Sequence, residues 1–207
     1  MAPRQIPGQP SLFAAAATDP RPADLAGLLA GPGRLRRLGG TVQVSVWVDA
    51  AWRVHALVAE FTRRGLPAGW EAAPASGYTV RTAYTTTLLP LAAAWSGEKL
   101  AKRPPAGLHL DGQALRLWVA AAGQATEEAY ALRLDPADEA HWPAVGAALA
   151  AAGLAAEVRP VPGPGSGPAP AYWITGRRRL ARLAELVGDP PATAPADQWP
   201  VAPAAIR

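Results

Sequence analysis

The 207-residue chain contains no cysteine, which excludes disulfide bonds, thiolate nucleophiles and cysteine-ligated zinc. Its three histidines, His55, His109 and His141, lie too far apart in the sequence to predict a metal cluster, so we expect no metal and no cofactor. The longest apolar stretch, 144–156, is too short and too rich in alanine to span a bilayer. Residues 12–17 lack the basic cluster that precedes a signal-peptide core. We therefore expect a cytoplasmic protein without membrane contact.

Charge is also scarce, because charged residues make up 17% of the chain, below the roughly 25% typical of soluble domains. Lys99 and Lys102 are the only lysines, and the abundance of Ala, Gly, Pro and Arg is typical of a GC-rich bacterial genome. Residues 1–110 carry 12 basic and 6 acidic side chains, a balance of +6, whereas residues 111–207 carry 8 and 10, a balance of −2. The basic first half fits a polyanionic partner, although an ordinary arginine-rich surface would give the same surplus.

The clearest local pattern is the strict alternation over 41–48, which predicts a strand with its valines on one face. Thr41, Gln43, Ser45 and Trp47 then occupy the other face. The other elements predicted for the first half are a helix over 24–31 with Asp24 as its N-cap, a strand over 34–38, a helix over 50–64 with Asp49 as its N-cap, a hairpin of 70–73 and 78–84, and a helix over 86–95.

The second half repeats this order of elements. The predicted elements are a helix over 112–122, a strand over 129–134, a helix over 137–152, strands over 154–159 and 172–175, and a helix over 177–187, with one strand hard to detect. The offset is steady, since Gly33 and Gly123 are 90 residues apart and Gly65 and Gly153 are 88 apart. The Pro- and Gly-rich segment 160–170 is predicted to be a flexible loop.

These patterns alone indicate an α+β protein made of a duplicated αββαββα unit. We predict a disordered tail over 1–20, a first repeat over 21–103 and a second repeat over 104–200.

Two nine-residue segments end predicted helices at equivalent places in the two repeats. Residues 25–33 read LAGLLAGPG and residues 115–123 read LRLWVAAAG. The first resembles the LAGLIDADG signature of homing endonucleases, and the second resembles its laxer form, Leu-Ala-x-Trp-x-x-Asp-Asp-Gly. Residues 95–105 (WSGEKLAKRPP) are similar to the family's Trp-Tyr-x-x-Gly-Lys-Lys-x-x-Pro connection, and 108–118 (LHLDGQALRLW) are similar to the entry into its second motif. The resemblance covers about residues 24–200.

The resemblance implies a duplicated LAGLIDADG-like fold, with two pseudo-twofold-related halves that each carry a twisted antiparallel sheet. The two motif helices would pack side by side along the axis, where small residues such as Ala26, Gly27 and Ala30 allow a close approach. Because a duplicated unit contains its own pseudo-dimer, we expect a monomer.

The family's catalytic acids are missing from this chain. In homing endonucleases an acidic residue precedes the final glycine of each motif, and the two carboxylates hold divalent metals against the scissile phosphates. Pro32 and Ala122 stand at those positions and offer no side-chain oxygen. Asp24 lies at the opposite end of its helix, about 12 Å from position 32 at 1.5 Å per residue, and Asp111 occupies the same end of the second motif helix. The resemblance thus implies the frame of a nuclease without catalytic residues or bound metal.

Homing endonucleases lay their sheets into the major grooves of DNA, and the resemblance transfers this role to solvent-side strand residues. The candidates for base contacts are Gln43, Ser45, Trp47, Thr79, Arg81, Arg133, Arg159, Trp173 and Thr175. The candidates for phosphate contacts are Arg34, Arg36, Arg37, Lys99, Lys102, Arg103 and Arg177. An ordinary solvated surface would place many of the same residue types outside, and the two tryptophans could instead pack under a loop.

The sequence thus favours a catalytically inactive LAGLIDADG-like protein that binds double-stranded DNA through its sheet surface, as a regulator. Whether the chain is an enzyme stays open, although the missing acids favour a pseudoenzyme. Two alternatives also stay open: a LAGLIDADG DNA endonuclease with displaced metal ligands, and a protein-interaction module that no longer binds DNA.

Overall fold

The computed structural model describes residues 14–15, 18–74, 76–95, 102–163 and 167–202. The first half contains α1 (Ala26–Ala30), β1 (Arg34–Leu38), β2 (Thr41–Val48), α2 (Ala51–Arg63), β3 (Ala68–Ala72), β4 (Tyr78–Thr82) and α3 (Leu89–Ala94). The second half contains α4 (Gly112–Ala122), β5 (Gly123–Ala125), β6 (Ala129–Arg133), α5 (Trp142–Ala151), β7 (Glu157–Pro162), β8 (Pro168–Thr175) and α6 (Arg177–Val187). The predicted αββαββα order is confirmed in both halves.

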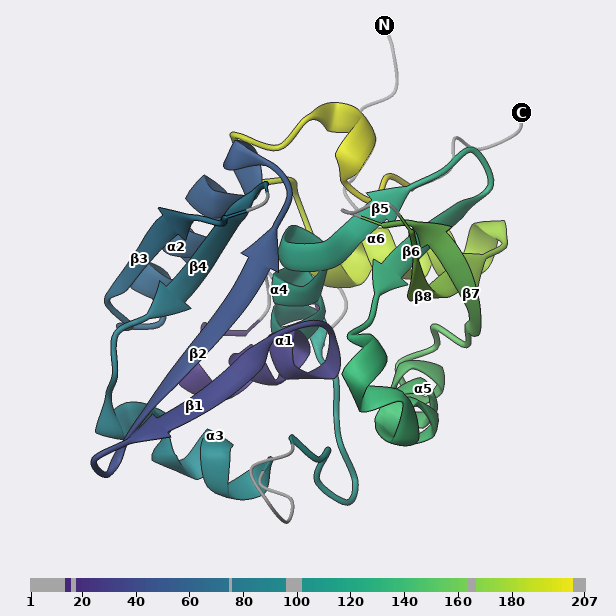
Figure 1. Cartoon of the computed structure of the whole chain (residues 1–207). Helices are drawn as coiled ribbons and strands as arrows, with labels where there is room; N and C mark the ends of the chain where they lie inside the picture. Colours follow the sequence, from purple (N-terminus) through teal and green to yellow (C-terminus); the bar gives the residue numbers. More distant parts are fainter. Residues whose placement is uncertain (1–13, 16–17, 75, 96–101, 164–166, 203–207) are drawn as a thin grey trace, which may run out of the picture.

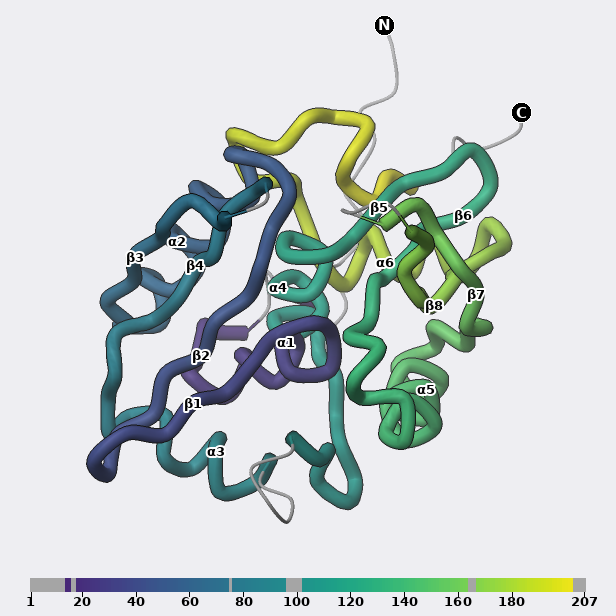
Figure 2. The backbone as a smooth tube through the Cα atoms, in the orientation of Figure 1, coloured from purple at the N-terminus to yellow at the C-terminus, as the bar shows by residue number. Residues whose placement is uncertain are grey.

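Each half forms one four-stranded antiparallel sheet, and the two sheets have the same strand order. The first sheet runs β1-β2-β4-β3 and the second runs β5-β6-β8-β7. Figure 1 shows the two sheets on either side of α1 and α4, which lie together at the centre. The backbone trace in Figure 2 shows β1 to β4, in purple to blue, on one side of the central helices and β5 to β8, in teal to green, on the other. Two copies of one unit therefore surround a shared pair of helices.

Strand β2 forms where the valine alternation predicts it. Val42, Val44, Val46 and Val48 are buried against the helices, while the residues between them are only half-buried. Burying a valine side chain contributes about 1.5–3 kcal/mol relative to leaving it exposed, which fixes the face and register of the strand. The polar residues of β2 are consequently held on the opposite side, which we call the outer face of the first sheet.

The ends of α2 and α5 show the duplication at the level of single hydrogen bonds. Gly65 and Gly153 follow these helices with φ values of +68° and +83°. The next amide in each copy reaches back five residues, from Leu66 to the Phe61 carbonyl at 3.0 Å and from Leu154 to the Leu149 carbonyl at 2.9 Å. A positive φ strains any residue with a Cβ, so glycine is required at both turns.

The central helices α1 and α4 pack with their backbones in direct contact. A Cβ added to Gly27 would overlap the backbone oxygen of Ala114, and one added to Gly31 would overlap the indole of Trp118. Leu28 and Leu115 from the two helices are fully buried in one hydrophobic core that contains residues of both halves. The predicted close approach of the motif helices through small residues is confirmed at Gly27.

Two predicted N-caps are wrong. The turn before α1 is a 3-10 helix, η2 (Pro22–Leu25), and its N-cap is Arg21. Asp24 is the third residue of this helix, and its carboxylate accepts a hydrogen bond from the Arg21 amide at 2.7 Å. The N-cap of α2 is Ala50, because the carboxylate of Asp49 is turned toward two arginines instead. In both cases a long-range ion pair competes with the local cap for the same carboxylate.

Three boundaries also differ from the sequence prediction. The predicted loop 160–170 belongs largely to the β7–β8 hairpin, in which Val161 pairs with Ala169, and only 164–166 lie outside the described residues. The helix predicted over 137–152 is divided into the 3-10 helix η5 (Pro136–His141) and α5. Strand β5 has only three residues, too few for a detectable alternation. Two further short 3-10 turns are η3 (Thr86–Leu88) and η6 (Ala196–Gln198).

The predicted tail 1–20 lies mostly outside the described residues, but its described part contacts α4. Gln113 donates from Nε2 to the carbonyls of Ala15 and Thr18 at 2.7 and 2.8 Å. The inner end of this segment is therefore anchored to the central helix. None of the described helices is long and apolar enough to cross a membrane.

Candidate functional site

A groove of about 730 Å³ runs along the outer face of the first sheet. One wall is this sheet, from β1 to β4. The other wall comes from the second half, where Leu134, Asp135 and Pro136 follow β6 and the β7–β8 hairpin contributes Gly163 and Gly167. The groove also reaches Pro32, the motif position at the end of α1. We call it the sheet groove.

Strand register gathers the polar side chains of the first sheet in this groove. Arg34 pairs with Ser45, and Arg36 pairs with Gln43 across β1 and β2. On the other side of β2, Ser45 pairs with Arg81 and Trp47 pairs with Thr79. Residues that pair directly in an antiparallel sheet point to the same face. The sequence-predicted residues that line the sheet groove are Arg34, Arg36, Gln43, Ser45, Trp47, Thr79, Arg81 and Arg133.

The groove is positive, with four arginines and two carboxylates along its walls. Arg34 lies 3.4 Å from Asp135, and Arg81 lies 2.8 Å from Glu71. The Arg34 side chain is 74% exposed, and both partners of the second pair are well exposed. An exposed pair such as Arg81–Glu71 contributes about 0–1 kcal/mol, so a phosphate can replace the carboxylate of Glu71 at little cost.

Two groove side chains are held in place by hydrogen bonds to the backbone. Gln43 donates from Nε2 to the Thr82 carbonyl at 3.0 Å, and Trp47 donates from Nε1 to the Ser76 carbonyl at 3.0 Å. The second bond closes the β3–β4 turn over the indole. The amide and the indole thereby present fixed edges to the groove.

Asp49 lines a neighbouring hollow of about 340 Å³, which shares Arg133 and Gly163 with the sheet groove, and it links both halves of the molecule. Its carboxylate accepts from Arg53 Nε at 2.8 Å and from Arg133 Nη1 at 2.7 Å. Burial alone would raise the pKa of Asp49, but the guanidinium groups of Arg133 and Arg53 hold this pKa below its ordinary value. Asp49 therefore stays ionised and orients Arg133, which lines the groove from β6.

Replacing Asp49 with asparagine is expected to lower the free energy of unfolding by roughly 1–3 kcal/mol at neutral pH, the usual value for hydrogen bonds to charged groups. Because the folded pKa is lowered, this stabilisation is complete above the ordinary carboxyl value of 3.8 and is lost as the pH falls below it. Denaturant titrations of both proteins from neutral to acidic pH measure the difference. A difference in unfolding free energy between Asp49→Asn and the wild type that stays constant down to the most acidic pH would contradict the assignment. The control is Glu157→Gln, whose side chain is 74% exposed and whose loss should leave stability unchanged.

The carbonyls at the C-terminal ends of α1 and α4 each accept hydrogen bonds from a cationic side chain. Lys102 Nζ donates to the carbonyls of Gly31 and Gly33 at 2.6 and 2.9 Å and lies 2.7 Å from Asp138. Burial lowers the pKa of Lys102, and the bonded carboxylate of Asp138 opposes this shift. All three ammonium donors are thus used inside the protein, which leaves none for the predicted phosphate contact.

Arg53 binds the carbonyls at the C-terminal end of α4 in the same way. Its Nη1 donates to the carbonyls of Val119 and Ala120 at 3.2 and 3.0 Å, and its Nη2 donates to the Gly123 carbonyl at 2.5 Å. The side chain is 3% exposed. We call Arg53 and Lys102 the helix-end cations. Positive charge near the C-terminus of a helix is favourable because the carbonyls there carry partial negative charge.

The divalent metals that such a fold implies do not fit these residues. Pro32 and Ala122 supply no oxygen, and the nearby carbonyls already accept hydrogen bonds from the helix-end cations. Asp24 is buried and bonded to Arg64 at 3.0 Å, and burial raises its pKa. Asp111 caps the start of α4. Within the described residues, no three His, Asp or Glu side chains form a group that could hold a metal ion.

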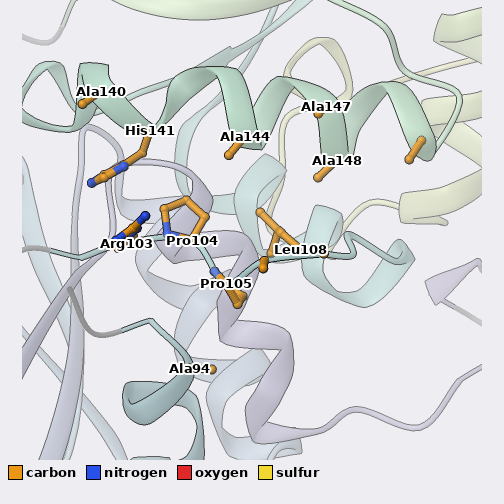
Figure 3. Close-up of a pocket in the computed structure, with 13 residues that line it drawn as sticks. Ala94, Arg103, Pro104, Pro105, Leu108, Ala140, His141, Ala144, Ala147 and Ala148 are labelled. Atoms are coloured by element: carbon orange, nitrogen blue, oxygen red, sulfur yellow. The ribbon is translucent and has the colours of Figure 1, made fainter.

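The remaining predicted contact residues lie away from the sheet groove. Arg103 is on a separate hollow of about 810 Å³ below α5, where Figure 3 shows it beside His141 and Pro104. Arg159 bonds Glu157 on the second sheet, and Trp173 packs on a small cluster there. Arg37, Thr175 and Arg177 are described but are not among the groove residues, and Lys99 lies outside the described residues.

Similar proteins were found at the level of structure. No family model matches the sequence, and no curated protein matches it. The homing endonuclease I-WcaI bound to its DNA recognition sequence aligns with a TM-score of 0.54 and 11% identity, over 84% of this chain and 84% of that one. A point mutant of I-SmaMI aligns with a TM-score of 0.38 and 12% identity, over 81% and 82%. The chain has a homing-endonuclease fold.

Within this fold, sequence reasoning missed the residues that act through long-range contacts. Asp49 and Arg53 are four residues apart, a spacing typical of a helical ion pair, and this is the one local signal for their role. Nothing local indicates that Arg53 reaches α4 or that Arg133 reaches Asp49, because these partners are 66 or more residues apart. Glu71 and Asp135, which give the groove its negative charges, also had no distinguishing pattern.

Proposed function

We propose that this protein binds double-stranded DNA in the sheet groove and does not cleave it. The observation that carries the proposal is the convergence of predicted contact residues from β1, β2, β4 and β6 on a single positive groove. Two of them are far apart in sequence, since Arg34 and Arg133 come from different halves. The DNA-bound state of the structural neighbour I-WcaI supports this assignment.

The groove has the chemistry for both kinds of DNA contact. A glutamine such as Gln43 can pair with the edge of adenine, and an arginine such as Arg81 can pair with guanine. Arg34 and Arg36, on the exposed strand β1, are suited to phosphate contacts, which set affinity and position. A two-stranded ribbon fits the major groove, and β1 and β2 form the antiparallel pair at one edge of the first sheet.

The residues at the C-terminal ends of α1 and α4 support the second part of the proposal, that the protein does not cleave DNA. Metal-assisted hydrolysis needs hard oxygen ligands around Mg²⁺. The helix-end cations would repel a divalent ion, and Pro32 and Ala122 cannot attract one. A protein that occupies a DNA site without cutting it can act as a regulator, and its two repeats allow it to do so as a monomer.

Binding and cleavage can be tested on the same fragments. We expect the full chain to shift duplex fragments from its own genome at low salt, with affinity falling as salt rises, and to leave them intact with Mg²⁺ or Mn²⁺. Cleavage would favour the alternative of an endonuclease with displaced ligands. Failure to bind any fragment at low salt would overturn the proposal and favour a protein-interaction module, which a pull-down from nuclease-treated lysate would detect.

Replacing Arg36 with glutamine is expected to weaken binding to all fragments alike and to reduce the slope of log affinity against log salt by about 1, because one phosphate contact is lost. Fluorescence anisotropy across a salt series measures this slope. The control is Arg182→Gln, an arginine of α6 that pairs with Glu185 and does not line the groove. Equal slopes for the wild type and Arg36→Gln would exclude Arg36 as a phosphate contact.

A further inference from the structure

The outer faces of the two sheets have different chemistry although the sheets have the same strand order. In the first sheet the central strands β2 and β4 present Gln43, Ser45, Trp47, Thr79 and Arg81. In the second sheet the matching strands β6 and β8 present Ala129, Ala131, Arg133, Ala169, Ala171, Trp173 and Thr175. Tyr130 and Leu132 face the core, which fixes this assignment. Alanines thus occupy most of the positions where the first sheet has hydrogen-bonding groups.

Ala131 and Ala171 at the centre of the second sheet are too deeply buried to contact a base even through their methyl groups. Ala131 and Ala171 are 0% exposed and Val161 is 2% exposed, because they form a cluster of their own with Ala169 and Trp173 packed against it. The Trp173 indole nitrogen is buried as well. The centre of this face is therefore apolar and buried, and the exposed side chain of Arg159 lies on the edge strand β7.

The two arginines of this face lie away from its centre or are buried, since Arg159 is on the edge strand β7 and Arg133 is buried. Arg159 donates to Glu157 from Nε and Nη2 at 3.2 and 2.5 Å. Arg133 is 7% exposed and is held by Asp49, at the boundary where it lines the sheet groove. The part of the second half that reaches the groove otherwise offers the carboxylate of Asp135 and residues that supply shape without hydrogen-bonding side chains. These are Leu134, Pro136, Gly163, Gly167, Pro168 and Ala169.

We propose that this protein reads base sequence with its first sheet alone, so that its DNA site carries sequence information on one side of the molecule only. The inference rests on the proposed DNA binding and adds which half of the molecule recognises the bases. Strand β2 has eight residues, and at about 3.3 Å per residue it spans roughly 26 Å. At about 3.4 Å per base pair this length corresponds to a run of about seven to eight base pairs.

Selection of bound duplexes from a random pool by the full chain tests this directly. We expect one continuous conserved run of up to about eight base pairs. Two separated runs of comparable information would overturn the inference while leaving DNA binding in place, and so would enrichment without any sequence preference. Failure to retain any duplex would overturn DNA binding itself, and the inference with it.

A matched pair of glutamine variants assigns the run to one sheet. Gln43 lies on the outer face of β2, and Gln124 lies on the outer face of β5 opposite Ala131. Gln43→Ala is expected to reduce the preference for the favoured base at one position by roughly tenfold, and Gln124→Ala is expected to leave every position of the selected run unchanged. A comparable change with Gln124→Ala, or none with Gln43→Ala, would contradict reading by the first sheet alone.

Discussion

Replacing Gly27 with alanine is expected to lower the free energy of unfolding by about 3 kcal/mol, at the upper end of what overpacking usually costs. The added Cβ overlaps the backbone oxygen of Ala114, and a backbone atom at a helix–helix contact cannot move aside as a flexible side chain can. The two central helices would have to separate, and each is surrounded by the shared core. A loss of this size is a large fraction of the 5–15 kcal/mol that stabilises a typical domain.

Denaturant unfolding followed by tryptophan fluorescence measures this effect, with Gly69→Ala as the control. A Cβ at Gly69 meets no atom within 4 Å, and the residue lies in the exposed strand β3. This variant adds the same methyl group and should be neutral or slightly stabilising. Equal stabilities of the two variants would show that the central helices can separate without loss.

The second large effect is expected for Arg53→Met, which should lower the free energy of unfolding by roughly 3–5 kcal/mol, as when one partner of a buried ion pair is removed. The methionine fills much of the same volume but donates no hydrogen bond. It leaves the carbonyls of Val119, Ala120 and Gly123 without this donor and removes one of the two partners of Asp49.

Arg63→Met is the matched control on the same helix. Arg63 is 51% exposed and pairs with Glu60, which keeps Arg64 and Arg116 as partners after the substitution. Its loss should cost less than about 1 kcal/mol. If the two methionine variants unfold at the same denaturant concentration, the carbonyl contacts of Arg53 contribute nothing to stability.

The parts of the fold that follow from local patterns could be predicted from the sequence. The valines of β2 and the glycines at 65 and 153 act on their immediate neighbours, so their effects are visible in a short window. Asp24 and Asp49 were predicted as caps because a cap is a local interaction, but each carboxylate is bound by an arginine from farther along the chain. Whether a carboxylate binds a local amide or a distant arginine is decided by the tertiary structure, and a short stretch of sequence carries no information about it.

The candidate site was predictable to the same degree. Alternation placed Gln43, Ser45 and Trp47 on one face, and the fold gathered them with Arg36 and Arg81 in the sheet groove. The same rule applied to the second sheet selected Arg159 and Trp173, which the β7–β8 hairpin holds in contacts of its own. Alternation shows which residues share a face but does not show whether that face is open.

The helix-end cations determine what an acidic residue placed at the end of α1 or α4 would meet. Pro32→Asp would introduce a carboxylate between Gly31 and Gly33, whose carbonyls hold Lys102, and Ala122→Asp would introduce one next to Gly123, whose carbonyl holds Arg53. Each new acid would form an ion pair with the cation already there before it could attract a metal. A designer seeking to build a nuclease on this frame would have to replace Lys102 and Arg53 as well, and would thereby remove the contacts that hold both central helices at their ends.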